Sequence, residues 1–326
     1  MTPIRALLLA AAIGNAASAS ASASASVNAE AFPDWAFPTC PKHPAPPAAE
    51  TAPLQVPGSD QHFSAQDIGE ISITKDWFPA DHAPLPFVIA RSHARDKYAC
   101  GYCHLPDGAG RPENAKVSGL PAAYIVMEVN ALRGEQRRSA RGDYKPSQLM
   151  RDAVAELTEE EIRSAADFFA QQSAKTFLRV VEQARVPAHT EACFVFKRAG
   201  HGTQPLGKTI VEMPDDYARF EARDPRVTYT AYVPLGSVAR GRALAEDGKR
   251  TPPCASCHGA GLAGDEYLPG PPLAGRFATY LFRQLYGFKT ASRAEEAALE
   301  MRPIVAQLSQ ADMIDLAAYA ASLPPK

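Results

Sequence analysis

The pentapeptide Cys-x-x-Cys-His occurs twice in this chain, and it restricts the possible folds more than any other feature. It reads CGYCH at residues 100–104 and CASCH at residues 254–258, 154 residues further on. Two closely spaced thiols beside an imidazole can bind a metal ion, form a disulfide or hold a group covalently. Whatever the fold, it must present the three side chains together in both places.

Metal binding, a disulfide and covalent attachment each require different features in the rest of the chain. A four-cysteine zinc site would require thiolates from two distant segments to converge, and it would leave both histidines without a role. A redox disulfide within Cys-x-x-Cys usually belongs to a βαβ thioredoxin pattern, which this sequence lacks. Covalent haem attachment explains every residue, because the thiols add to the two vinyl groups and the histidine binds the iron.

We therefore predict two covalently bound c-type haems, with His104 and His258 as proximal ligands of the irons. The thiols predicted to hold the haems are those of Cys100, Cys103, Cys254 and Cys257.

An internal repeat extends beyond the pentapeptides. The run GLPAAYIVMEVNALRGEQR begins at Gly119 and GRFATYLFRQLYGFKTASR begins at Gly275, with Tyr124 and Tyr280 at matching places. Both runs have the spacing of apolar residues that is typical of amphipathic helices. The two halves of the chain are therefore predicted to share a helical architecture.

Two methionines recur at matching places in this repeat. Met150 opens MRDAVAEL and Met301 opens MRPIVAQL, 47 and 44 residues after the second cysteine of each pentapeptide. We expect each in a loop before a last helix, which starts at Thr158 or at Ser309. The chain has only six methionines, so we predict that these two are the distal iron ligands. A thioether ligand favours Fe(II) and raises the reduction potential. The alternative is that both are core residues.

These motifs resemble the class I cytochrome c fold, and in particular the two-domain di-haem cytochromes of the c4 type. The resemblance covers residues of about 90–183 and 234–323. It implies a mostly α fold of two tandem domains, each wrapping one haem in three main helices with one haem edge exposed. It also implies electron transfer by irons with His and Met ligands.

The two halves match the family unequally. Pro271, in PPLAG, stands where the family has a proline whose carbonyl orients the proximal histidine. Ala115 takes that place in the first half, where a backbone carbonyl can still serve. The opening helix is also less clear there, because FVIARSHARDKYA replaces the glycine-containing GSVARGRALAED of residues 236–247.

The chain begins like an exported protein. Arg5 precedes the short apolar run of residues 6–13, followed by several A-x-A-like cleavage sites. We expect a periplasmic location, with at most peripheral membrane association, and the near-neutral net charge of −2 gives no sign of nucleic-acid binding. The expected parts are a signal peptide (1–26), a proline-rich extension (27–89), cytochrome domain 1 (90–184), a linker with short strands (185–233) and cytochrome domain 2 (234–326).

The extension and the linker lie outside two minimal cytochrome domains. A short strand is expected within residues 68–78, and three more strand-like runs occur in the linker, so small irregular or β additions should accompany the helices. Each segment holds one leftover cysteine. We expect Cys40 and Cys193 to form a disulfide in an oxidising compartment, with intermolecular pairing as the alternative.

Three functions are compatible with these features. The first is a soluble electron carrier between a donor dehydrogenase or quinol-oxidising complex and an acceptor oxidase or cytochrome. The second is the cytochrome subunit of a periplasmic dehydrogenase complex. The third is a haem enzyme, such as a di-haem peroxidase or a thiosulfate-oxidising cytochrome, which needs an open iron. The matching methionines favour the carrier, which is not itself an enzyme.

Overall fold

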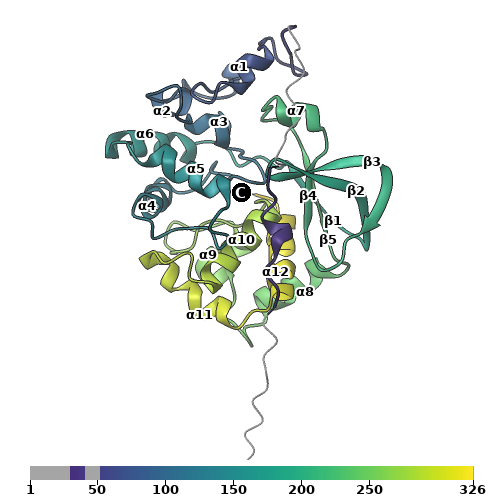
Figure 1. The fold of residues 1–326 in the computed structure, drawn as a ribbon. Coiled ribbons are helices and arrows are strands. Elements are labelled where there is room, and N and C mark those ends of the chain that lie inside the picture. Colours follow the sequence, from purple (N-terminus) through teal and green to yellow (C-terminus); the bar gives the residue numbers. More distant parts are fainter. Residues whose placement is uncertain (1–29, 41–51, 326) are drawn as a thin grey trace, which may run out of the picture. The chain divides into compact units, whose positions relative to one another are not determined.

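The computed structural model describes residues 30–40 and 52–325, and the contacts below lie within the unit that begins at Pro33 (Figure 1). The expected signal peptide lies outside the described residues. Helices dominate on both sides of a β-containing segment. Among the described residues, no helix has the length and apolar run that crossing a bilayer requires.

The C-terminal part, residues 237–322, is the second helical segment, and its buried core also includes Phe37, Ile210 and Ala231 from outside this segment. Its helices are α8 (Ser237–Glu246), α9 (Ala255–His258), η3 (Ala260–Leu262), α10 (Ala278–Lys289), η4 (Glu296–Leu299), α11 (Met301–Ala306) and α12 (Gln310–Ser322). The start of α12 is fixed by a capping box, in which Ser309 and Asp312 bond each other's backbone N–H. Helices α8 and α12 pack closely at Gly241, where a Cβ would lie 2.0 Å from the Asp315 carbonyl oxygen. The glycine in the opening of this half is therefore a packing requirement.

The first helical segment, residues 87–170, repeats this order of helices, but its opening helix is shorter. Its helices are α2 (Phe87–Ala90), α3 (Cys100–His104), α4 (Ala122–Arg133), α5 (Lys145–Val154) and α6 (Glu159–Ala170). The capping box expected at Thr158 and Glu161 is present and starts α6. The segment that replaces the opening helix forms only the single turn α2, whereas α8 has ten residues.

Strands lie between the two helical segments. They are β1 (Leu178–Glu182), β2 (Arg185–Ala192), β3 (Val195–Pro205), β4 (Val211–Pro214) and β5 (Tyr229–Val233), with helix α7 (Tyr217–Glu221) before β5. Strand β5 is central, parallel to β1 and antiparallel to β4, and β2 and β3 form an antiparallel hairpin (Figure 1). The three strand-like runs of the linker therefore form strands. Strand β1 lies earlier, inside the segment expected to be domain 1.

The strand expected within residues 68–78 does not form. Helix α1 (Ala65–Gly69) takes up the start of this run, and only Ile73 pairs there, in an isolated bridge with Arg91. The apolar residues at the end of this run are buried without a sheet. Trp77 and Phe78 pack with Val56 and Ala222 in a small cluster. The remaining turns of the extension are η1 (Asp34–Ala36) and η2 (Pro79–Asp81).

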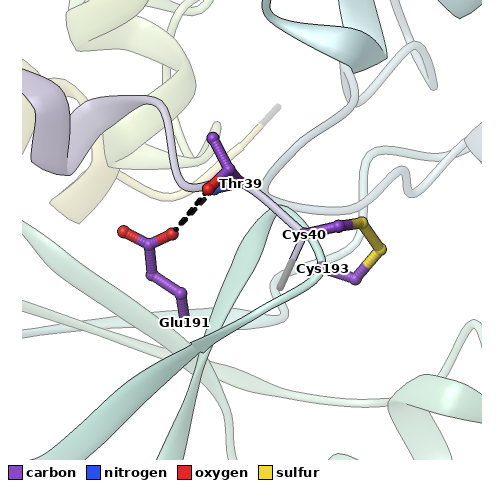
Figure 2. The surroundings of a disulfide bond; sticks show 4 residues. All are labelled: Thr39, Cys40, Glu191 and Cys193. Atoms are coloured by element: carbon purple, nitrogen blue, oxygen red, sulfur yellow. Dashed lines mark hydrogen bonds between the residues drawn. A yellow bond between two sulfur atoms is a disulfide. The ribbon is translucent and has the colours of Figure 1, made fainter. Parts of the chain in front are cut away.

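Cys40 and Cys193 form a disulfide, as the sequence indicated (Figure 2). The bond closes a loop with a sequence separation of 153 residues and ties the start of the extension to the turn between β2 and β3. Beside it, the Thr39 N–H donates to the Glu191 carboxylate at 2.9 Å (Figure 2). The intermolecular alternative is not needed.

Glu212 of β4 connects the sheet to the second helical segment through hydrogen bonds. Its buried carboxylate accepts hydrogen bonds from the N–H groups of Ala278 and Thr279, at 2.9 and 3.3 Å, and from the Thr279 hydroxyl. These donors form the start of α10, where backbone N–H groups lack helical partners. Burial raises the pKa of Glu212 from 4.5 to about 7, although the Thr279 hydrogen bond acts in the opposite direction.

This raised pKa predicts a pH-dependent stability. The folded state binds the proton more tightly than the unfolded state, so the contribution of Glu212 is fully present below pH 4.5 and is lost as pH rises through 7. The whole effect corresponds to about 3 kcal/mol. In Glu212→Gln this loss should be absent, so denaturant unfolding at pH 5 and pH 8 should differ less than in the wild type. An unchanged pH profile would contradict this assignment.

Candidate haem-binding sites

The first pentapeptide forms helix α3, which places both thiols and the histidine on one turn. His104 Nδ1 lies 2.8 Å from the carbonyl oxygen of Ala115. Because a carbonyl oxygen only accepts, Nδ1 carries the proton and Nε2 keeps the lone pair that can bind a metal. Burial lowers the pKa of His104, which favours the neutral, metal-binding form. Alanine therefore replaces the expected proline without loss of this contact.

The second pentapeptide repeats this arrangement. His258 ends α9, and its Nδ1 lies 2.8 Å from the Pro271 carbonyl oxygen. Burial also lowers the pKa of His258. Gly270, which precedes this proline, lies so close that a Cβ would be 2.6 Å from His258 Nδ1 and 2.7 Å from the Cys257 oxygen. Only a residue without a side chain fits between them.

A Gly270→Ala variant should therefore disturb the second site alone. The added Cβ must move the Pro271 carbonyl or the imidazole, which removes the hydrogen bond that orients the ring. We expect a perturbed axial-ligand spectrum or incomplete attachment at the second site, measured by visible spectroscopy and haem-stained gels. Gly142→Ala is the matched control, because nothing lies within 4 Å of a Cβ at that position. Equal spectra for the two variants would contradict the prediction.

The two methionines lie beside the cores that hold their cysteines. Met150 and Cys100 both pack against the buried cluster of the first helical segment, and Met301 and Cys254 both pack against that of the second. Neither methionine is in a loop, which corrects the expectation. Met150 lies within α5 and Met301 is the first residue of α11. Their assignment as iron ligands stays a prediction.

A cavity of about 450 Å³ joins the parts of the first site. Cys100, Cys103, His104 and Met150 all line it. Much of the remaining wall is apolar and includes Leu120, Ile125, Val129, Leu132, Ile162 and Phe169. Paired thiols, an oriented imidazole, a thioether and an apolar wall suit a haem, whose ring is apolar. Among the described residues, no three His, Cys, Asp or Glu side chains cluster as a metal site.

Comparison with known families finds a match for the segment that contains the second pentapeptide. A family model described as cytochrome c matches residues 238–324, which include CASCH, Pro271 and Met301. Residues 238–324 are a cytochrome c domain. Membership of this family implies a covalently bound haem iron at that domain.

Individual relatives align with different shares of this chain. Cytochrome c4 of Pseudomonas aeruginosa is 40% identical over 70 residues, which is 21% of this chain and 32% of the relative. The chain thus matches about a third of that protein's length. Among solved structures, the thiosulfate dehydrogenase TsdBA from Marichromatium purpuratum aligns with 70% of this chain and 36% of its own, at 26% identity and a TM-score of 0.45. Cytochrome c4 from Acidithiobacillus ferrooxidans aligns with 69% of this chain and 98% of its own, at 20% identity and a TM-score of 0.44.

The cytochrome c domain also forms part of the first site. Its residues Tyr280, Arg283, Gln284 and Arg293 line the cavity beside His104. The loops after α4 and α10 meet at an isolated antiparallel bridge between Arg137 and Arg293. The first cavity is therefore closed by both helical segments.

A buried polar network holds these two loops together. Arg137 donates to Glu128 at 2.7 Å, to Tyr280 at 3.0 Å and to Gln284 at 3.1 Å, and Arg293 forms a second ion pair with Glu128. Burial opposes ionisation of Glu128, yet Arg137 and Arg293 keep its pKa below the usual value. The guanidinium groups of the cavity wall are the side chains that would pair with the carboxylates of a haem.

Sequence reasoning did not identify this network. A signal was present, because Arg137 and Arg293 are as far apart in the sequence as Tyr124 and Tyr280, which the repeat had already matched. Glu128 and Gln284 keep the same offset. The repeat alone does not show that the two loops contact each other.

Proposed function

We propose that the chain is a periplasmic di-haem c-type cytochrome that carries single electrons, with one His/Met-ligated iron in each helical segment. The observation that carries the proposal is the repeated arrangement of an attachment turn, a histidine oriented by a backbone carbonyl and a methionine beside the same core. The haem supplies the one-electron redox couple.

The residues of the chain perform three tasks in this role. The cysteines would fix the group, the carbonyls of Ala115 and Pro271 hold the imidazoles in orientation, and the apolar wall of the first cavity would exclude water. With a histidine and a methionine bound to each iron, neither iron would have a position left for a substrate. We propose that the electron donor is a dehydrogenase or quinol-oxidising complex and that the acceptor is an oxidase or another cytochrome. Weak, transient contacts suit such exchange.

Visible spectra of the haem-loaded protein test this proposal. A haem count of two per chain, low-spin spectra with the far-red sulfur-to-iron band, and no carbon monoxide binding would support it. One haem per chain would contradict the di-haem arrangement. Carbon monoxide binding at half of the haem would instead favour a haem enzyme with an open iron. A stable co-purifying dehydrogenase would favour the subunit alternative.

A further inference from the structure

The two attachment helices differ in their exposure to solvent. In α3, Gly101 and Tyr102 are buried, and Tyr102 is only 8% exposed. In α9, the corresponding Ala255 and Ser256 are exposed, and so is Cys257. The repeat thus produces two similar sites, of which only the second has its attachment face open.

The extension and the linker together cover α3. A Cβ on Gly101 would lie 2.7 Å from the Thr74 hydroxyl, so the extension lies directly on the helix. From the linker, Arg223 donates to the Tyr102 carbonyl oxygen at 2.7 Å, and its guanidinium carbon lies 3.4 Å from the centre of the Tyr102 ring.

These two covering segments are also joined to each other. The Trp77 indole N–H donates to the Ala222 carbonyl oxygen at 2.7 Å, and the two residues share a buried cluster. A partner protein would have to displace this joined layer to reach the attachment face of α3. Such displacement would break buried contacts, whereas weak redox encounters bury little surface.

The open face of α9 has an aromatic and acidic border. The Gly270 N–H donates to the Cys257 carbonyl oxygen at 3.0 Å, which holds the loop of residues 264–272 against the attachment helix. In this loop, Tyr267 is 86% exposed. Asp265 and Glu266 directly precede Tyr267 and are exposed, and the Asp265 carboxylate accepts a hydrogen bond from the Tyr267 N–H at 2.9 Å. Neither forms an ion pair with another described residue. Aromatic side chains are favoured at the centres of protein interfaces, and unpaired border charges steer partners of opposite sign.

We infer that the face formed by α9 and residues 264–272 is the docking surface for a redox protein with lysines or arginines around its own prosthetic group. This inference rests on the proposed function. One electron leaves the ferrous iron of the partner and enters this chain at the second site, and no bond or proton is transferred. The first site exchanges electrons with proteins through the second.

Charge reversal on the two faces tests the inference in the haem-loaded full chain. The test variant is Asp265→Lys with Glu266→Lys. The control is Asp152→Lys with Glu156→Lys, because these two exposed residues line a small pocket beside Cys100 in the first segment. The control also removes the exposed ion pair between Glu156 and Lys97. Both variants change the net charge equally. The probe is mitochondrial cytochrome c, a strongly basic single-haem protein, used in its ferrous form for stopped-flow kinetics and in its zinc-substituted, redox-inert form for calorimetric binding.

At low ionic strength, we expect the Asp265/Glu266 variant to accept electrons about tenfold more slowly than the wild type and to bind the probe about tenfold more weakly. Both differences should vanish at high salt. The control should stay within about twofold of the wild type in both measurements. Equal losses in both variants, or a loss only in the control, would overturn the inference. No loss in either variant would also overturn it.

Failure of the proposed function has a different signature. If a small reductant such as ascorbate does not reduce the wild-type haems, or if carbon monoxide binds one iron, the carrier function fails for every variant alike. Normal reduction by ascorbate together with no binding of the basic probe overturns only the docking surface.

Discussion

Replacing Met150 by alanine is expected to open the first haem iron. Met150 lines the cavity that also contains Cys100, Cys103 and His104. Loss of the thioether should allow carbon monoxide to bind half of the reduced haem and should halve the far-red sulfur-to-iron band. Because methionine favours Fe(II), the reduction potential of this haem should fall by an amount on the order of 0.1 V or more. Spectroelectrochemistry and carbon monoxide titration measure both effects.

Met301→Ala is the matched variant for the second site. Met301 lies beside the core of the cytochrome c domain that also contacts Cys254. The two single variants should each affect a different half of the haem, and the double variant should bind carbon monoxide at both irons. Met313 provides a control, because it is fully buried in the same core and its replacement by leucine should leave the spectrum unchanged. If Met150→Ala retained the whole far-red band, another residue would be the first distal ligand.

Removing the disulfide should cause the largest loss of stability that we predict. Cys40 and Cys193 are separated by 153 residues, and a cross-link over so long a loop restricts the unfolded chain strongly. In the chain-entropy description, the double variant Cys40→Ala/Cys193→Ala should lose about 4–5 kcal/mol of unfolding free energy. Denaturant unfolding of the ferric, haem-loaded protein, followed by far-UV circular dichroism, measures this loss.

Thr39→Val is the control for this experiment. It removes the hydroxyl contact with Glu191 at 3.1 Å but keeps the covalent link and the backbone N–H bond to the same carboxylate. Because the contact is exposed, its loss should change the unfolding free energy by less than about 1 kcal/mol. A double cysteine variant as stable as Thr39→Val would show that noncovalent contacts hold the extension without the disulfide.

The sequence by itself determined the parts of the fold that depend on local chemistry. Each pentapeptide forms a short helical turn, which brings its two thiols and its imidazole together as the spacing predicts. The capped start of α6 followed from Thr158 and Glu161, whose side chains bond neighbouring N–H groups. Pairing of Cys40 with Cys193 followed from their number, since no other cysteines were left.

Other expectations were wrong because contacts from distant segments replace local preference. The alternation within residues 68–78 was interpreted as a strand, but Trp77 and Phe78 are buried against the linker and need no sheet partner. Met150 was expected in a loop, but α5 includes it, with the preceding Pro146 near the start of this helix.

Only the tertiary structure decided how the two sites differ. The repeat predicts similar sites, because each contains the same motif and a similar set of helices. The difference arises from Thr74, Trp77 and Arg223, which belong to segments outside the repeat and cover only α3. The buried Glu128 network likewise joins two loops that are distant in sequence. A pattern of residues specifies local geometry, whereas burial depends on which distant segments pack against it.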